Sequence, residues 1–157
     1  MKRTSIIWLV LIQWALAFEW LHSGWSKWSG PGFITNIGKT LQGFATKTPY
    51  TSYGSFLQNS VIPHSELFGN IIRSGEILVG IALVLGGLLL LYRKNTHPFT
   101  IWLLVTALFA GALMNLNFFL ASGWSSPSAW GVNIIMGFTH LILGLHYVLN
   151  RRELASE

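Results

Sequence analysis

Hydrophobic residues gather in four long runs along the chain, and charged residues lie almost entirely at the ends of these runs. The runs cover approximately residues 5–28, 67–92, 99–121 and 131–149. Each is long enough to cross the roughly 30 Å hydrocarbon core of a bilayer as a helix. Polar and apolar residues do not alternate as they do in the strands of a membrane barrel. The pattern therefore predicts a single transmembrane domain, 1–157, built from four helices.

The first run also has features of a secretory signal peptide. Lys2 and Arg3 precede an apolar stretch that ends in Ala-Leu-Ala at 15–17, where a signal peptidase could cut. The apolar pattern nevertheless continues through Phe18 and Trp20. This continuation favours a helix that is retained.

Basic residues at the ends of the runs predict the orientation in the membrane. If the four helices alternate in direction, three basic pairs fall on one side: Lys2 and Arg3, Arg93 and Lys94, and Arg151 and Arg152. Lys and Arg collect on the cytoplasmic side, so both termini are predicted to be cytoplasmic. The formal net charge of +5 then reflects topology, and we expect membrane lipid rather than nucleic acid as a partner.

The first external loop, between the first two spans, carries a helical pattern of its own. Apolar residues recur at helical spacing there: Phe33, Ile34, Ile37, Leu41 and Phe44. They predict a short amphipathic helix at the membrane interface. Tight turns at 95–98 and 125–128 make the flanking spans antiparallel neighbours. The predicted fold class is all-α, an integral membrane four-helix bundle with a short amphipathic helical segment in the first external loop.

The chain contains no cysteine, which limits the chemistry open to it. Disulfides, a thiolate nucleophile and a cysteine-ligated iron–sulfur cluster are excluded within this chain. A redox role therefore needs another carrier, either a bound organic molecule or a second redox subunit.

Two carboxylates, Glu19 and Glu76, stand inside apolar sequence, where a charge is costly. Counting from the predicted cytoplasmic ends at about 1.5 Å per residue places both about 25 Å from that face. Asn115 and Asn133, in the third and fourth spans, come to the same depth by the same count. All four helices thus place a polar residue at one level near the external end, and we expect these residues to meet in a shared site.

Other polar and aromatic residues lie close to this layer. His22 is three residues from Glu19, and Arg73 is three residues from Glu76, a spacing that brings side chains together. The candidate substrate-binding residues are Trp20, His22, Lys27, Arg73, Asn115, Asn117, Phe118, Asn133 and His140. Glu19 and Glu76 are the candidate catalytic acids, because buried carboxyl groups suit proton exchange. A structural alternative stays open, in which Glu76 pairs with Arg73, and Glu19 with His22 or Lys27, to hold the helices together.

His140 shares a helical face with Asn133 and lies about 10 Å deeper than the polar layer. It is either a hydrogen-bonded packing residue or a proton relay at the wall of the site. No haem is expected, because two axial ligands must share one depth and His22 and His140 are about 12 Å apart along the membrane normal. The spacing of Glu19, Glu76 and His22 matches no recognised ligand set, so no metal site is predicted.

Three parts of the sequence resemble a known family. They are Trp20, Gly24 and Lys27 at the outer end of the first span, the stretch RSGEILVGIALVLG at 73–86, and the stretch NFFLASG at 117–123. Together they are similar to the DoxX/DoxD membrane proteins, and the resemblance covers most of the chain. It implies a four-helix bundle in a prokaryotic cytoplasmic (inner) membrane. The stretch at 130–140 is closer to DoxD, which implies an association with thiosulfate:quinone oxidoreductase.

The leading hypothesis is a quinone-reactive membrane subunit of a redox system. A quinone needs an apolar slot, hydrogen-bond donors at its carbonyls and an acid that exchanges protons. Trp20 and Phe118 would line the slot, Glu19 or Glu76 would exchange protons, and four residues would donate: Arg73, His22, Asn115 and Asn133. Arg73 and Lys27 would alternatively attract a small anion such as thiosulfate. The rival is a non-catalytic anchor or assembly partner of a redox complex, and a transporter is less favoured because no inverted repeat is present.

Overall fold

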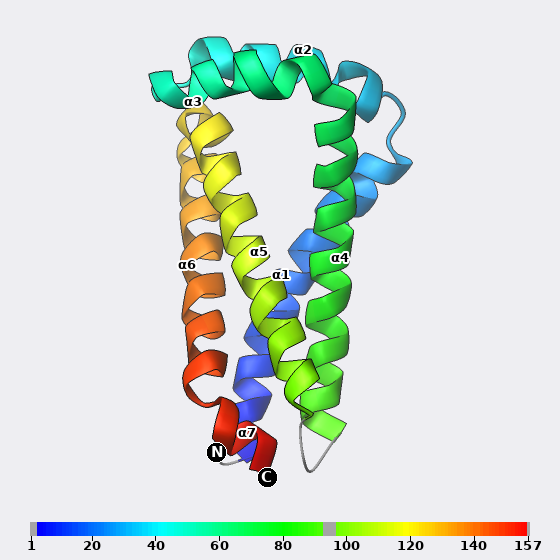
Figure 1. The fold of residues 1–157 in the computed structure, drawn as a ribbon, viewed down its shortest axis with the longest axis vertical. Coiled ribbons are helices and arrows are strands. Elements are labelled where there is room, and N and C mark those ends of the chain that lie inside the picture. The colour runs from blue at the N-terminus through cyan, green and yellow to red at the C-terminus, as the bar shows by residue number, and fades with distance from the viewer. Residues whose placement is uncertain (1–2, 93–96, 157) are drawn as a thin grey trace.

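The computed structural model describes residues 3–92 and 97–156, and in this part of the chain the backbone is almost entirely helical, with no strand. Four long helices run the length of the molecule (Figure 1): α1 (Arg3–Ser29), α4 (Ser65–Tyr92), α5 (Pro98–Ser122) and α6 (Pro127–Leu149). All four are long and apolar enough to cross a membrane. The predicted all-α class and the four apolar helices are therefore confirmed.

The two ends of the molecule differ. The start of α1 and the short helix α7 (Arg151–Ser156) lie at one end, which we call the terminal end. At the opposite end, α2 (Phe33–Lys47) and α3 (Thr51–Phe56) lie across the ends of the long helices. We call this the cap end.

The cap is held by apolar contacts and by two hydrogen bonds to α5. Ile37 and Leu41 of α2 are buried against the π-helical turn η1 (Leu57–Val61), which the 3₁₀ turn η2 (Ile62–His64) joins to α4. Thr48 Oγ1 donates to the Leu120 carbonyl at 2.8 Å. The Tyr53 hydroxyl donates to the Asn117 carbonyl at 3.2 Å. The amphipathic segment is thus a packed layer over the ends of the helices.

Helix α6 begins four residues before the predicted start of the fourth span. The helix starts early because of an N-cap residue and a proline, neither of which contributes to the hydrophobic pattern. Ser126 Oγ accepts a hydrogen bond from the Ala129 N–H at 3.0 Å, and Pro127 occupies the first turn. Ser at the N-cap and Pro just inside a helix both favour initiation there. Only the short turn η3 (Gly123–Ser125) is left to separate α5 from α6.

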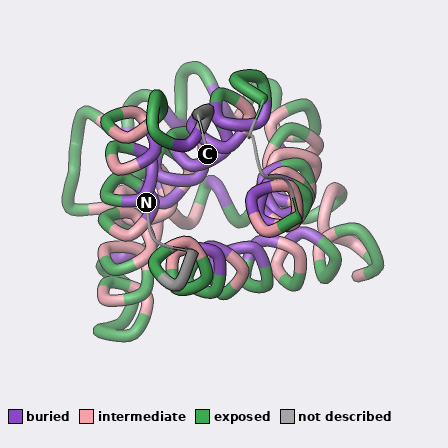
Figure 2. Tube along the Cα trace, turned by 90° about the horizontal axis from the view of Figure 1, so that it is seen from below, coloured by how far each residue is buried: buried purple, intermediate pink, exposed green. Residues whose placement is uncertain are grey.

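The long helices pack in chain order, α1 on α4, α4 on α5 and α5 on α6. Their shared core contains Ala17, Leu83, Leu104 and Leu108, which are fully buried. Figure 2 shows the buried positions facing inward and the exposed positions facing outward. Most large exposed residues are themselves apolar, as expected for helices surrounded by hydrocarbon.

Part of the predicted orientation signal cannot be placed. Lys2, Arg93 and Lys94 lie outside the described residues, and so do the first two positions of the predicted turn at 95–98. Arg151 and Arg152 are exposed at the terminal end. The side of the membrane that this end faces stays a prediction.

Candidate functional site

A buried ion pair joins α1 to α4 toward the cap end. The side chain of Glu76 has no exposed surface, and both of its carboxylate oxygens accept hydrogen bonds from Lys27 Nζ at 2.8 Å. Lys27 Nζ also donates to Ser23 Oγ at 2.6 Å. A lysine from the neighbouring helix therefore compensates the buried carboxylate. Lys27 is in turn occupied and is not free to attract an anion.

The two helices can form this pair because α1 has a glycine where they cross. A Cβ atom at Gly24 would lie 2.9 Å from Ile77 Cγ1 and 3.1 Å from Glu76 Cβ, which is too close for an unshifted neighbour. Lys27 follows Gly24 by three residues and lies on nearly the same face of α1. The close crossing thus brings the lysine amine to the carboxylate.

Arg73 lies one turn from Glu76 on α4, but it does not pair with it. The guanidinium lies over the Trp28 ring, with Cζ 3.9 Å from the ring centroid. Its Nη2 donates to Asn70 Oδ1 at 2.6 Å, while the buried Nε has no hydrogen-bond partner in the structure as described. The predicted Arg73–Glu76 pair is wrong, because Lys27 satisfies the carboxylate and the ring of Trp28 attracts the guanidinium.

Glu19 and His22 do not join this site. Both are exposed on α1, and among residues 3–92 and 97–156 Glu19 forms no hydrogen bond or ion pair, with His22, Lys27 or any other group. Trp20 occupies the buried face, and the adjacent Glu19 is turned about 100° away around the helix. The predicted meeting of Glu19 and Glu76 is therefore wrong. Equal depth along two helices does not fix the direction in which side chains point.

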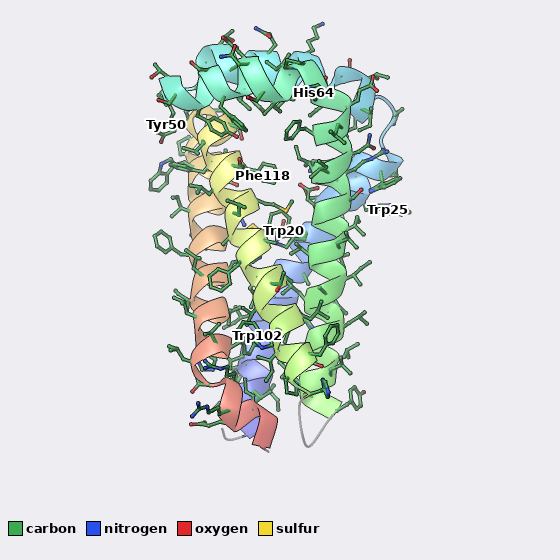
Figure 3. The ribbon with its side chains drawn as sticks, in the orientation of Figure 1. Trp20, Trp25, Tyr50, His64, Trp102 and Phe118 are labelled. Carbon is green, nitrogen blue, oxygen red and sulfur yellow. The ribbon has the colours of Figure 1, made fainter. Side chains whose placement is uncertain are left out.

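Trp20 and His140 form a buried hydrogen bond that links α1 to α6. Trp20 Nε1 donates to His140 Nε2 at 2.8 Å, and His140 Nδ1 lies 2.7 Å from the Met136 carbonyl. Because indole is only a donor, His140 Nε2 carries no proton, and Nδ1–H donates to Met136. His140 is thus a neutral imidazole with both ring nitrogens hydrogen-bonded, and whether it serves packing or proton transfer stays a prediction. Phe118 lies beside Trp20, with ring centroids 6.3 Å apart (Figure 3).

This contact corrects the depth estimate made from residue counts. The count places Trp20 and His140 about 10 Å apart along the membrane normal, yet their side chains touch. Helix α1 crosses the others obliquely (Figure 1), so its rise per residue along the long axis is shorter than in an upright helix. Its side chains also point back toward its N-terminus, which carries the indole toward the terminal end.

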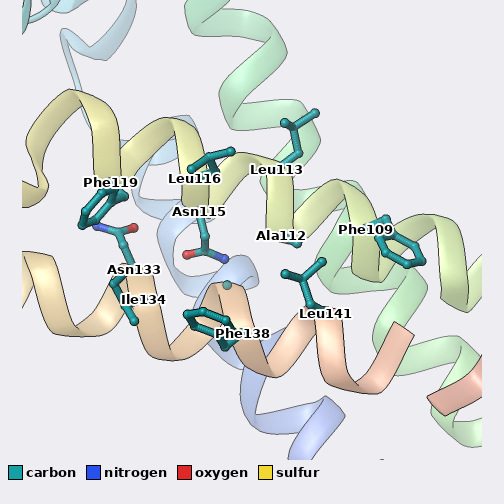
Figure 4. Close-up of a pocket in the computed structure, with 11 residues that line it drawn as sticks. Phe109, Ala112, Leu113, Asn115, Leu116, Phe119, Asn133, Ile134, Phe138 and Leu141 are labelled. Atoms are coloured by element: carbon teal, nitrogen blue, oxygen red, sulfur yellow. The ribbon is translucent and has the colours of Figure 1, made fainter. Parts of the chain in front are cut away.

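Asn115 and Asn133 come together in a groove between α5 and α6. The groove has a volume of about 450 Å³ and is shown in Figure 4. It is lined by Phe109, Ala112, Leu113, Asn115, Leu116, Phe119, Asn133, Ile134, Gly137, Phe138 and Leu141. Several of these side chains are exposed, so the groove opens on the outer, apolar surface of the helices. Among the described residues that line it, the two amides are the only polar side chains, and neither glutamate is among them.

The amides are partly occupied by their own helices. Asn115 Nδ2 donates to the Gly111 carbonyl at 2.9 Å, and Asn133 Nδ2 donates to the Ala129 carbonyl at 2.8 Å. An amide nitrogen carries two hydrogens and its oxygen accepts two bonds, so each side chain keeps donor and acceptor capacity. Asn117 lies outside the groove, where its Nδ2 bonds the Leu113 carbonyl.

A second buried polar cluster was not predicted. The Tyr147 hydroxyl donates to Gln13 Oε1 at 2.8 Å, and Gln13 Nε2 donates to the Leu83 carbonyl, which joins α6, α1 and α4. Gln13 is the polar residue in the middle of the first apolar run, and this isolation was the available signal. Because its amide does not ionise, Gln13 was not singled out when charged residues within the apolar runs were used to predict the site.

Over the residues that the structure describes, the fold defines a class, that of helical proteins with four helices able by length and composition to cross a membrane. Within that class, no protein-family model, no curated protein and no solved structure matches this chain. The resemblance to the DoxX/DoxD proteins therefore stays a prediction.

Proposed function

We propose that this protein is a quinone-reactive subunit of a membrane redox system, a four-helix bundle in a prokaryotic cytoplasmic membrane with both termini in the cytoplasm. The observation that supports the proposal is the groove between α5 and α6. It combines an apolar lining with two amides. In a membrane-spanning protein, its open side would face the acyl chains in which lipid-soluble molecules diffuse. Small-molecule sites typically have this composition, with apolar walls and a few polar groups that fix orientation.

The size and walls of the groove suit a quinone ring. Its volume of about 450 Å³ lies within the usual range of ligand sites. Phe109, Phe119 and Phe138 supply aromatic surface on which a flat ring can stack. The apolar tail of a quinone would run out of the open side of the groove into the acyl chains. The quinone could therefore move between the membrane and the groove without exposing its apolar tail to water.

The amides suit both redox states of a quinone. The oxidised form has carbonyl oxygens that accept hydrogen bonds from the free N–H of Asn115 or Asn133. The reduced form has hydroxyl groups that donate to the amide oxygens. A carboxylate would accept from the quinol but, when ionised, would have no hydrogen for the quinone. Two asparagines therefore hold the ring without favouring one state by charge.

The proposal changes the roles first expected for the carboxylates. Glu76 is neutralised by Lys27, and Glu19 is on another helix face, so neither exchanges protons with a molecule in the groove. Electrons would come from a second redox subunit. A thiosulfate-like substrate would be handled by that subunit, since Lys27 is already paired.

Quinone binding to purified protein tests the proposal. Wild type, Asn115→Leu and Asn133→Leu would be titrated with a short-chain quinone in mild detergent, with Asn117→Leu as a control on the same helix. Loss of one hydrogen bond to a ligand carbonyl costs about 1 kcal/mol, so Kd should rise about fivefold or more in each groove variant. The control should stay within twofold. Equal affinity in all four proteins, or no binding, would overturn the proposal.

A second function is favoured by the buried Lys27–Glu76 pair. A fully compensated carboxylate between two helices is what a non-catalytic membrane anchor or assembly partner requires. That function predicts no bound quinone after mild extraction, detected by mass spectrometry of the lipid extract. It also predicts that substitutions of polar residues change stability alone.

A further inference from the structure

Helix α1 presents a regular row of exposed residues to the outside of the molecule. The row, which we call the α1 stripe, consists of Trp8, Ile12, Ala15, Glu19, His22 and Ser26. Its members follow one another at alternating steps of four and three residues. Leu11, Phe18 and Trp25 flank it at steps of seven and are exposed as well. The buried side of α1 carries other residues, among them Gln13 and Trp20.

A repeat of four and three residues is the pattern by which one helix packs along another. Positions seven residues apart stay on one side of a pair of helices that coil around each other with a left-handed twist. Membrane helices pack in this geometry when small residues let their backbones approach. Ala15 and Ser26 are small members of the stripe. The stripe is thus one continuous face of α1 with the spacing that a helix–helix contact uses, and its polar residues decide whether it is such a contact.

The carboxylate of Glu19 favours a protein partner over lipid at this surface. A carboxylate on a lipid-exposed helix face is costly, and such groups pair with another polar group or face a protein interior. Glu19 has no such partner among residues 3–92 and 97–156. His22, one turn on, is exposed and only stacks on Phe18, with ring centroids 6.0 Å apart. The stripe therefore offers one acceptor and one donor, both available.

We propose that the α1 stripe is the interface between two copies of this chain, in which Glu19 of each copy accepts a hydrogen bond from His22 of the partner copy. Copies inserted in the same direction are related by a two-fold axis along the membrane normal, so their α1 helices point in the same direction across the membrane. Glu19 and His22 are three residues apart, which is about 4.5 Å along the helix. A glutamate side chain spans this offset, and the two-fold axis repeats the bond on the other side.

The charge pattern selects a second copy over another partner. In a parallel pair, Glu19 would face Glu19 of the partner copy, and two carboxylates at one level repel each other unless each has a donor. His22 supplies that donor from the same stripe. The surface is therefore complementary to itself. A partner of a different sequence would have to bring its own donor to meet Glu19 and its own acceptor to meet His22.

Cysteine cross-linking tests the geometry directly, because the chain has no cysteine and each introduced one is unique. Ile12→Cys and Ala15→Cys, on the stripe, would be oxidised in native membranes. Ile81→Cys on α4 and Leu145→Cys on α6 are matched controls, since both positions are exposed. A disulfide needs Cα atoms within about 7 Å, so covalent dimers should form at the stripe and not at the controls. Dimers at Leu145→Cys instead, or at no position, would overturn the proposal.

Variants of the pair test the chemistry. In Glu19→Ala or His22→Ala combined with Ala15→Cys, cross-linked dimer should fall at least tenfold. The exchanged variant with Glu19→His and His22→Glu should restore it, because the reciprocal bonds form again in reverse order. Unchanged thermal melting would show that each variant still folds. Full cross-linking without Glu19, or cross-links of Ala15→Cys to a different protein only, would refute the pairing of two copies.

Discussion

Whether the buried charge of Glu76 destabilises this fold depends on one residue, Lys27, which pairs with it. The carboxylate is fully buried, while Lys27 keeps 23% of its side chain exposed. Most of the desolvation cost of the pair therefore comes from burying Glu76. The amine of Lys27, which stays partly exposed, offsets this cost by its attraction to the carboxylate. Removing the lysine leaves the charge without a partner, which costs far more than the pair itself contributes.

Lys27→Met should therefore lower the free energy of unfolding in detergent by about 3 kcal/mol. The double variant Lys27→Met with Glu76→Leu should recover most of the loss, because no buried charge remains. Lys39→Met, at an exposed position of α2, is the control and should change stability by less than about 0.5 kcal/mol. Equal stability of Lys27→Met and wild type would contradict the role of the pair.

Gly111 has a similar influence on the hydrogen bond between Trp20 and His140. A Cβ atom there would lie 2.5 Å from His140 Nε2 and 3.3 Å from Trp20 Nε1, so the two rings would have to separate. Gly111→Ala should destabilise the protein by about 1–3 kcal/mol through overpacking, despite the better helix propensity of alanine.

Gly131→Ala is the matched control, since an added Cβ meets nothing within 4 Å there. It should leave stability unchanged or raise it by up to about 1 kcal/mol. Thermal unfolding followed by circular dichroism would measure both variants. A Gly111→Ala protein as stable as Gly131→Ala would show that the rings do not need this close approach.

At the scale of the elements, the cap depends on few polar ties to the long helices. Tyr53 and Thr48 each donate one hydrogen bond to a carbonyl near the end of α5. The Leu120 carbonyl is one of the last four in α5 and has no i+4 partner within the helix, so Thr48 also completes the last turn of α5. The remaining attachment of α2 is its apolar face. The cap should therefore loosen separately from the rest of the molecule.

Tyr53→Phe removes one of these ties and should raise hydrogen exchange across α2 and α3 about fivefold, which corresponds to about 1 kcal/mol. Exchange in the middle of α5 and α6 should not change. Tyr50→Phe is the control, because the Tyr50 hydroxyl forms no hydrogen bond within the described structure. Faster exchange throughout the protein would mean that the cap and the long helices unfold together.

At the scale of the whole molecule, the apolar runs alone predicted the four long helices. Hydrophobic length reports directly on what must lie in hydrocarbon, so α4 and α5 were predicted to within two residues at each end. The start of α6 was missed because it is set by the Ser126 cap and Pro127, which are local polar and backbone effects. The hydrophobic pattern along the chain does not report on the Ser126 cap or on Pro127.

The candidate site was predicted less well, because it depends on how each helix is turned about its axis. Counting residues gives depth, and it grouped Glu19 with Glu76, although the two face different surroundings. It also separated Trp20 from His140, which touch because α1 is tilted. The groove between α5 and α6 depends on the facing sides of two helices. Of the residues that line the groove, only Asn115 and Asn133 were among the candidate site residues predicted from the sequence.

Photoaffinity labelling tests the central claim that a quinone binds between α5 and α6. Purified protein would be illuminated with a short-chain azidoquinone and the labelled peptides sequenced. We predict label on groove residues such as Leu116 and Phe138, reduced by excess unmodified quinone and by Asn115→Leu. Label concentrated on α1 and α4 around Glu76, or spread over all four helices without competition, would contradict the account.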